Sequence, residues 1–209
     1  MCLLQFTDLP LHHNLLKALE IKGLNTPTEI QTKAIPYGLM GKDLIASSKT
    51  GSGKTAAFGL GILNKLDEKN FNVQSLVLCP TRELADQVSG EIRRLARGVA
   101  NVKVATVYGG TPLKAQAASL NKGVHIVVGT PGRIEDHIGR GTLQLNEVDT
   151  FVLDEADRML EMGFQSSITA VVDSIPKQRQ TLLFSATYPK KIQEIADYVL
   201  TDPIVVKAE

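Results

Sequence analysis

Seven short apolar runs recur along the chain, and between them apolar residues return every three or four positions. Most of the runs are continuously apolar rather than alternating, which is typical of parallel strands covered on both faces. The runs are residues 43–46, 75–79, 102–108, 124–129, 150–153, 180–184 and 203–206. This pattern predicts an α/β domain with a mostly parallel central sheet of about seven strands and helices on both faces.

Helical periodicity fills the intervals between these runs. One predicted helix has Pro189 in its first turn, where proline is favoured. Its apolar stripe is Ile192, Ile195, Ala196 and Val199. A second stripe is Phe164, Ile168, Val171, Val172 and Ile175. Two more helical segments, 11–22 and 27–40, precede the first strand. The 209 residues contain no linker or repeat, so we expect one domain with a helical segment at 1–41 and a core at 42–209.

The segment SKTGSGKT, residues 48–55, leads from the first apolar run into a helix predicted to begin near Lys54. Glycines in the turn let backbone N–H groups surround a phosphate, and the helix N-terminus adds a favourable dipole. The Lys54 ammonium is expected to reach the outer phosphates, and the Thr55 hydroxyl to ligate Mg²⁺. The predicted nucleotide-binding residues of this loop are Ser48, Lys49, Thr50, Gly51, Ser52, Gly53, Lys54 and Thr55.

This loop departs from the usual phosphate-loop pattern at one position. The pattern begins with Gly, and Ser48 stands there in this chain. Since GSGKT is intact, we expect the loop to form. An ordinary glycine-rich turn between a strand and a helix is the alternative interpretation.

A second segment, VLDEAD at 152–157, ends an apolar run in acidic residues. Open α/β sheets place ligands at the carboxyl ends of their strands. We expect Asp154 to anchor Mg²⁺, partly through water, and Glu155 to polarise an attacking water. The alternative is that Asp154 or Asp157 caps the following helix. Three acids in four residues after a buried strand favour the metal site, and the two segments together predict a nucleoside triphosphatase.

Composition and charge restrict the remaining possibilities. The net charge of +1 gives no sign of bulk nucleic-acid binding, so any such site must be local. The densest basic cluster, Arg93, Arg94 and Arg97, is interpreted as the solvated face of a helix. The apolar stripe of that helix is Leu84, Val88, Ile92 and Leu95.

The cysteines and histidines predict no further chemistry. Cys2 and Cys79 cannot form a disulfide framework, which fits a reducing cytoplasm, and Cys79 is expected to be a small buried hydrophobe. The four histidines lack metal-ligand spacing, so we expect no metal besides Mg²⁺. The apolar runs are too short for a membrane span, and residues 1–10 lack the features of a secretion signal. A cytoplasmic protein without membrane contact is predicted.

Several motifs occur together in an order that resembles the DEAD-box RNA helicases. DEAD at 154–157 gives that family its name, and GLNTPTEIQ at 23–31 resembles its Q motif. PTRELA at 80–85, Gly109-Gly110 and TPGR at 130–133 resemble the RNA-binding motifs of that family. SAT at 185–187 resembles its motif that couples ATP hydrolysis to unwinding. The segments GSGKTAAFGLGIL and LVLCPTRELADQV are similar to the bacterial DbpA type within the family.

The resemblance implies a RecA-like fold that binds ATP. A Gln carboxamide matches the N6 amino group and N7 of adenine, so Gln31 is implied to select ATP, with Phe6 stacking on the base. Leu24 replaces an aromatic residue of the Q motif, a departure that affects packing under the adenine. Ser185 and Thr187 are implied to hydrogen-bond Asp157 and so transmit the nucleotide state.

The resemblance also implies RNA contacts to phosphates and 2′-hydroxyls rather than to base edges, and hence little sequence preference. Each segment taken alone could equally be a capped turn. The implied RNA-binding residues are Pro80, Thr81, Arg82, Gly110, Thr130, Gly132 and Arg133.

By the same resemblance, this chain is the first of two RecA-like domains of a monomeric RNA helicase, and the second domain lies outside it. Because that second domain supplies an arginine finger, we expect this chain alone to bind ATP weakly, hydrolyse it poorly and not unwind RNA. The implied target is ribosomal RNA during large-subunit ribosome assembly. The alternatives are a nucleotide kinase or GTPase, against which the Q motif and SAT argue, and an RNA-binding module without turnover.

Overall fold

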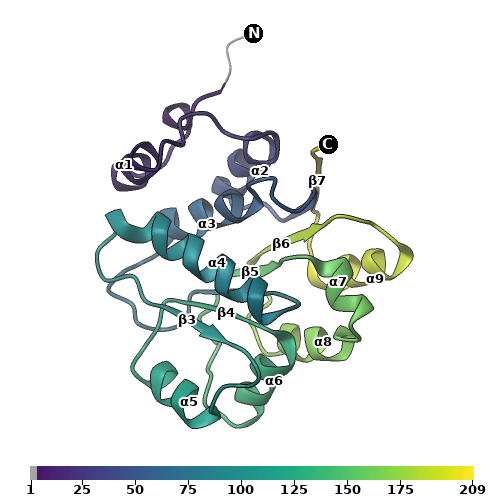
Figure 1. The fold of residues 1–209 in the computed structure, drawn as a ribbon. Helices are drawn as coiled ribbons and strands as arrows, with labels where there is room; N and C mark the ends of the chain where they lie inside the picture. Colours follow the sequence, from purple (N-terminus) through teal and green to yellow (C-terminus); the bar gives the residue numbers. More distant parts are fainter. Residues whose placement is uncertain (1–3) are drawn as a thin grey trace.

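A single parallel sheet organises the structure, a computed structural model that describes residues 4–209. Its strands have the spatial order β3-β4-β2-β5-β6-β1-β7, and every adjacent pair is parallel (Figure 1). They are β1 (Leu44–Ser47), β2 (Ser75–Leu78), β3 (Val104–Val107), β4 (Ile126–Gly129), β5 (Thr150–Leu153), β6 (Gln180–Ser185) and β7 (Ile204–Lys207). The predicted parallel sheet of about seven strands is confirmed, and each strand overlaps one of the seven apolar runs.

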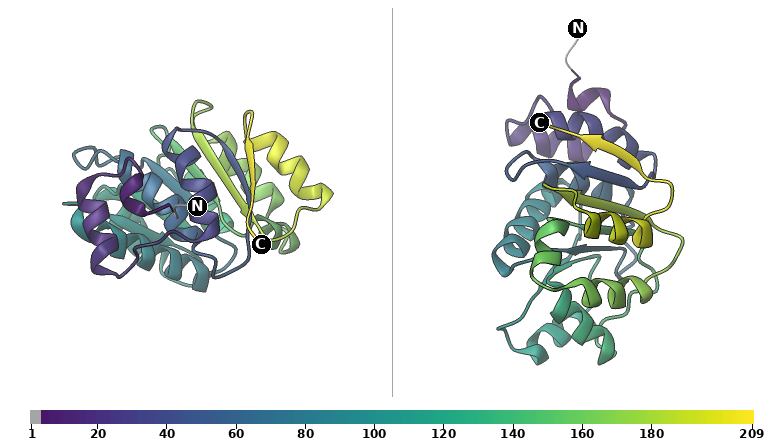
Figure 2. Two further views of the ribbon diagram at one scale, coloured as in Figure 1. Left: turned by 90° about the horizontal axis from the view of Figure 1, so that it is seen from above. Right: turned by 90° about the vertical axis from the view of Figure 1, so that its right-hand side faces the viewer.

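Helices cover both faces of this sheet, as predicted (Figure 2). The first set is α1 (His13–Ile21), α2 (Glu29–Leu39), α3 (Lys54–Lys65) and α4 (Arg82–Leu95). The second set is α5 (Leu113–Asn121), α6 (Pro131–Gly139), α7 (Ala156–Glu161), α8 (Gln165–Asp173) and α9 (Lys190–Val199). Two short 3₁₀ turns, η1 (Phe6–Asp8) and η2 (Ala96–Gly98), complete the described elements.

Alternate strand residues belong to opposite halves of the core, because successive side chains of a strand point to opposite faces. Leu44 and Ala46 of β1 pack with α1–α4, while Ile45 between them packs with the second set of helices. On the first face, the rings of Phe58 and Phe184 lie 5.4 Å apart between centroids. The continuous apolar runs in the sequence arise from this burial on both sides.

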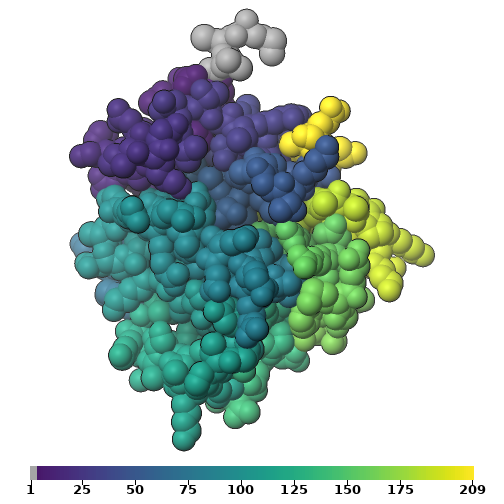
Figure 3. All heavy atoms as spheres, viewed as in Figure 1, coloured from purple at the N-terminus to yellow at the C-terminus, as the bar shows by residue number. Residues whose placement is uncertain are grey.

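The N-terminal helices share that core rather than forming a separate layer. Leu15 of α1 and Ile30 of α2 belong to the same buried cluster as Phe58 of α3. The C-terminal strand β7 lies against α2, where Lys33 Nζ donates a hydrogen bond to the Lys207 carbonyl over 2.6 Å. The space-filling view shows the purple N-terminal segment seated on the blue and teal part of the chain, with the yellow C-terminus beside it (Figure 3).

Some details differ from the sequence prediction or fall outside it. Pro189 is the N-cap of α9, just before its first turn, in an extended conformation that proline adopts easily. Phe164 and Ile175 flank α8 rather than lying in it. Cys79 is buried with a free thiol, whereas Cys2 lies outside the described residues. Within residues 4–209, no helix is long and apolar enough to cross a membrane.

Candidate functional site

The predicted site segments gather along one edge of the sheet. Because all the strands are parallel, their carboxyl ends lie at the same edge, where α/β proteins bind ligands. The segments after β1, β5 and β6, which neighbour each other, are residues 48–53, 154–157 and 185–187. The segments after β2, β3 and β4, which also neighbour each other, are residues 79–81, 108–112 and 130–133. The strand order thus places the predicted nucleotide and RNA segments in adjacent halves of one edge.

The glycine-rich loop folds as predicted despite its initial serine. Gly51 and Gly53 adopt φ of 80° and 88°, the left-handed region that glycine enters without a steric cost. The helix α3 begins at Lys54, as expected. The backbone N–H of Ser48 donates to the Ser185 carbonyl over 3.3 Å, which ties the loop to the neighbouring strand. The Ser48 and Ser52 hydroxyl oxygens are buried and have no hydrogen-bond partner among residues 4–209.

Lys54 joins the two predicted catalytic acids in a buried cluster. Its Nζ lies 2.9 Å from Asp154 Oδ1 and 3.5 Å from Glu155 Oε1. Lys54 is 6% exposed and Asp154 is 0% exposed. Burial raises the pKa of the Asp154 carboxyl, and the Lys54 charge opposes that rise. Apart from this ion pair, neither carboxylate oxygen accepts a well-directed hydrogen bond from a described residue. A buried carboxylate that lacks such hydrogen bonds is suited to binding a further cation.

Glu155 has a backbone conformation that the sequence did not reveal. Its φ of 54° is in the left-handed region, which costs a non-glycine residue about 1–2 kcal/mol. This turn separates β5 from α7 and lets the Glu155 carboxylate meet Lys54 and Thr50, whose Oγ1 lies 3.4 Å from Glu155 Oε1. Glu155 itself is the N-cap of α7, without a capping side-chain hydrogen bond in the described chain. The alternative role of Asp154 or Asp157 as the helix cap is therefore wrong.

Asp157 instead connects the acidic segment to the end of β6. Its Oδ2 accepts hydrogen bonds from the Thr187 N–H and Thr187 Oγ1, over 3.0 and 2.9 Å. The expectation that Ser185 makes the same contact is wrong in this structure. Ser185 Oγ donates to the Thr187 carbonyl over 2.7 Å, because the serine is the last residue of β6 and turns toward its own chain.

Gln31 lies against the glycine-rich loop, a contact that the sequence analysis missed. Its Oε1 accepts from the Thr28 N–H over 2.9 Å, and its Nε2 donates to the Gly53 carbonyl over 3.0 Å. Gln31 is 5% exposed. The spacing of Thr28 and Gln31 is that of a capping box, which could have predicted the first of these bonds. The carboxamide keeps one N–H and one lone pair for another partner.

Phe6, the expected stacking residue, lines a hollow that does not include Gln31. This residue is 3% exposed and packs in the core with the half-buried Leu24. It lines a hollow of about 590 Å³ formed with η1, α1 and residues 24–25, and the walls of this hollow do not include Gln31. The structure does not bring these two residues into a single cavity.

The predicted RNA segments meet at the turn after β3, residues 108–111. From one side, Arg82 at the start of α4 donates to the Gly109 carbonyl over 3.4 Å. From the other side, Arg133 of α6 donates to the Thr111 carbonyl over 3.0 Å. Gly110, with φ of 87°, adopts a left-handed conformation, and a side chain there would collide with Arg82. The two arginines therefore hold the turn between them.

The remaining residues of these segments lie where a strand gives way to a helix, as expected. Thr81 is the N-cap of α4 and accepts from the Leu84 N–H over 3.3 Å, while Thr130 is the N-cap of α6. Pro80 is buried and Gly132 is exposed. The basic cluster at Arg93, Arg94 and Arg97 is exposed, as the interpretation of a solvated face requires.

A sequence profile of the DEAD/DEAH box helicase family matches residues 28–195, which include the glycine-rich loop, the acidic segment and the arginine-held turn. The chain belongs to the DEAD/DEAH box helicase family. Members of this DEAD-box group use ATP.

Curated relatives and a solved structure are similar over nearly the whole chain. The ATP-dependent RNA helicase DbpA of Escherichia coli is 50% identical over 94% of this chain and 44% of its own length. The DEAD-box ATP-dependent RNA helicase CshA of Geobacillus kaustophilus is 50% identical over 98% of this chain and 44% of its own length. A DEAD box protein from Methanococcus jannaschii superposes with a TM-score of 0.94 at 44% identity, covering 98% of this chain and 56% of that chain. The chain spans less than half the length of these two curated relatives.

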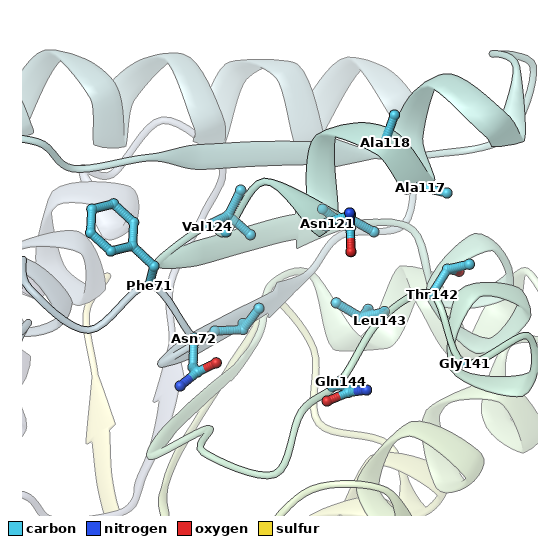
Figure 4. Close-up of a pocket in the computed structure, with 13 residues that line it drawn as sticks. Phe71, Asn72, Ala117, Ala118, Asn121, Val124, Gly141, Thr142, Leu143 and Gln144 are labelled. Carbon is cyan, nitrogen blue, oxygen red and sulfur yellow. The ribbon is translucent and has the colours of Figure 1, made fainter.

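Another hollow of this DEAD-box domain lies away from the predicted site. It has a volume of about 570 Å³, and its walls come from residues 71–73, 117–118, 120–121, 123–124 and 141–144 (Figure 4). These walls contain no predicted site residue and no charged side chain among the described residues. Within residues 4–209 there is also no group of three or more His, Cys, Asp or Glu side chains that could hold a metal.

Proposed function

We propose that this chain is the first catalytic domain of an ATP-dependent RNA helicase, which binds ATP with Mg²⁺ and an RNA backbone. The complete protein then hydrolyses ATP to unwind or remodel RNA. One observation carries the proposal: the buried cluster of Lys54, Asp154 and Glu155 lies at the start of a helix. The arginine-held turn lies along the same sheet edge.

The glycine-rich loop fits the phosphates of ATP. The positive φ of Gly51 and Gly53 and the free N-terminus of α3 suit an anion. The buried, unpartnered hydroxyls of Ser48 and Ser52 lie in the same loop and are available to a ligand. Lys54 is proposed to exchange its two carboxylate partners for the outer phosphates. The spare N–H and lone pair of Gln31 fit the adenine edge, while stacking by Phe6 stays a prediction.

The acidic cluster fits Mg²⁺. Asp154 presents buried oxygens that lack well-directed hydrogen bonds from residues 4–209, and hard carboxylate oxygens are the ligands Mg²⁺ prefers. We assign Asp154, partly through water, and the Thr55 hydroxyl as its holders. When bound, Mg²⁺ neutralises charge that develops on the phosphates. Glu155, with its carboxylate only partly buried, is proposed to orient and polarise the attacking water.

The arginine-held turn fits the sugar-phosphate backbone of RNA. The guanidinium groups of Arg82 and Arg133 and the N-termini of α4 and α6 supply donors for phosphate oxygens. Such contacts read no bases, so this domain is proposed to bind RNA with little sequence preference. The bond from Asp157 to Thr187 is proposed to couple the nucleotide site to β6.

The finer assignments rest on resemblance alone. We propose ribosomal RNA in large-subunit ribosome assembly as the target, with a second RecA-like domain completing a monomeric, cytoplasmic protein. The chain is as similar to CshA as it is to DbpA, so the target has to be established by experiment. Crosslinking of the protein to RNA in cells, followed by sequencing of the bound RNA, identifies the target directly. If ribosomal RNA is not enriched among the bound RNA, this target is refuted.

An ATPase assay tests the central proposal. Hydrolysis is measured with and without RNA for this chain and for a longer polypeptide that includes the second domain. We expect weak hydrolysis by this chain and RNA-stimulated hydrolysis by the longer form. A preference for GTP without RNA stimulation indicates a nucleotide kinase or GTPase instead. RNA binding without turnover in either form indicates a binding module, and both results contradict the proposal.

A further inference from the structure

One glutamine of α5 connects both sides of the arginine-held turn, although no motif in the sequence marked it. Gln116 Nε2 donates to the Tyr108 carbonyl over 2.8 Å and also hydrogen-bonds Thr111 Oγ1. Its Oε1 accepts from Arg133 over 3.0 Å and lies 2.9 Å from His137 Nε2. A carboxamide has two N–H donors and two acceptor lone pairs, so all four are used here.

The partners determine the orientation of the Gln116 amide. Arg133 can only donate, so the amide oxygen must face it. The same oxygen then requires a proton on His137 Nε2. His137 Nδ1 lies 2.7 Å from Thr142 Oγ1, whose hydroxyl also reaches the His137 carbonyl over 3.1 Å. His137 is fully buried, so this arrangement is held inside the domain. Thr142 also lines the hollow of about 570 Å³, where it is labelled in Figure 4.

The acceptors that hold Arg133 carry no charge. The Thr111 carbonyl and the Gln116 amide oxygen are both neutral, and Arg133 forms no ion pair with any described residue. By contrast, Arg140, the C-cap residue of α6, pairs with Asp136 over 2.8 Å. Neutral acceptors fix a guanidinium without cancelling its charge, so Arg133 keeps its attraction for an anion.

We propose that Gln116 is a positioning residue for RNA binding. Oriented by His137, its amide holds the Arg133 guanidinium and the turn at residues 108–111 in the arrangement that receives an RNA phosphate. This inference rests on the proposed function, because it assumes that Arg133 contacts RNA. Gln116 itself touches no RNA in this role.

The test is a double-mutant cycle on RNA affinity. Binding of a short oligouridine to this chain is followed by NMR titration for Arg133→Ala, Gln116→Met and the double variant. Gln116→Met keeps the shape of the side chain and removes its hydrogen bonds. We expect Arg133→Ala to weaken binding about tenfold, the loss of one hydrogen bond to a charged group. Gln116→Met should weaken it by several-fold, with no further loss when Arg133 is already absent.

A second readout and a control separate positioning from general destabilisation. The Nη1–H signals of Arg133, which make both of its hydrogen bonds, should lose their protection from exchange in Gln116→Met, and Gln116→Ala should reproduce both effects. Gln193→Ala, a glutamine on the exposed surface of α9, serves as the matched control and should change neither.

Each outcome has a distinct meaning. If Arg133→Ala leaves RNA affinity unchanged, the proposed RNA site fails. If Arg133→Ala weakens binding while Gln116→Met does not, or if the two losses add, the positioning role is overturned and the RNA site stands. Non-additive losses together with an unprotected Arg133 signal support the proposal.

Discussion

Asp154 and Glu155 are adjacent carboxylates of the same kind in different surroundings. Asp154 is fully buried, and burial raises the pKa of its carboxyl, whereas Glu155 keeps part of its side chain in solvent. Both face the single ammonium of Lys54. The buried carboxylate is suited to a fixed cation and the partly exposed one to a water molecule, so their different burial accounts for two different proposed roles.

Removal of Lys54 tests the phosphate site. We expect Lys54→Ala to abolish detectable ATP binding, because this ammonium is the buried charged donor of the loop and charge-assisted contacts dominate phosphate recognition. Isothermal titration with ATP and Mg²⁺ measures the change. Lys177→Ala, at an exposed lysine before β6, is the control. Unchanged affinity in Lys54→Ala would contradict the assignment.

Glu155 is tested by a substitution that keeps its shape. In the longer, hydrolysing polypeptide, Glu155→Gln should preserve ATP affinity while turnover falls by about 10²–10⁴, the usual contribution of a positioned acid or base. Steady-state ATPase measurements with RNA present give the rate. Glu161→Gln at the exposed end of α7 should hydrolyse normally. Near-normal turnover in Glu155→Gln would remove this residue from the water-positioning role.

The glycine-rich loop is attached to α2, because Gln31 Nε2 donates a hydrogen bond to the Gly53 carbonyl. A β-carbon at Gly53 would lie 2.5 Å from Gln31 Nε2, whereas at Gly51 no described atom lies within 4 Å. Both glycines have positive φ, so substitution at either one strains the backbone. The difference between the two positions isolates the contact with α2.

This difference predicts unequal costs for two otherwise similar substitutions. Gly51→Ala should lower the free energy of unfolding by about 1 kcal/mol, the cost of a side chain at positive φ. Gly53→Ala should cost about 1 kcal/mol more, because it also displaces the Gln31 hydrogen bond. Urea unfolding followed by circular dichroism measures both. Equal costs would show that the contact between the loop and α2 contributes nothing.

The sequence predicted elements better than it predicted contacts between them. Strands buried on both faces leave apolar runs, and the glycine-rich loop leaves a motif, so both were found. The left-handed turn at Glu155 leaves no compositional signal, since glutamate seldom adopts it. The Ser185 bond to its own chain and the network around Gln116 depend on side-chain orientations that only the packed structure determines.

In the molecule as a whole, the two proposed sites follow two separate groups of strands in one sheet. Strands β5, β6 and β1 carry the proposed nucleotide segments, and strands β3, β4 and β2 carry the proposed RNA segments. The two groups meet where β2 pairs with β5, and the Asp154 N–H donates to the Leu78 carbonyl there over 2.9 Å. A rigid parallel sheet therefore fixes the spacing between the two sites.

The stability of the whole domain should depend on pH through His137. Burial, reinforced by the Arg133 charge, lowers the pKa of His137 below its ordinary value of about 6.5. A folded state that prefers the neutral imidazole is most stable above pH 6.5 and loses that contribution as the pH falls through the folded pKa. The difference in unfolding free energy between wild type and His137→Gln should thus shrink from pH 7.5 to 5.5, roughly the range over which an unperturbed histidine titrates. Denaturant titrations across this range test it, and a constant difference would contradict it.

The position of β5 has a consequence for how the domain opens. With three strands on either side, β5 is the central strand, and we expect its amides to exchange with solvent only when the sheet as a whole comes apart. Asp154 and Glu155 follow it directly. Local fluctuations that release an outer helix or an edge strand thus leave the acidic pair in place. The groups proposed for catalysis thus directly follow the strand that we expect to exchange most slowly.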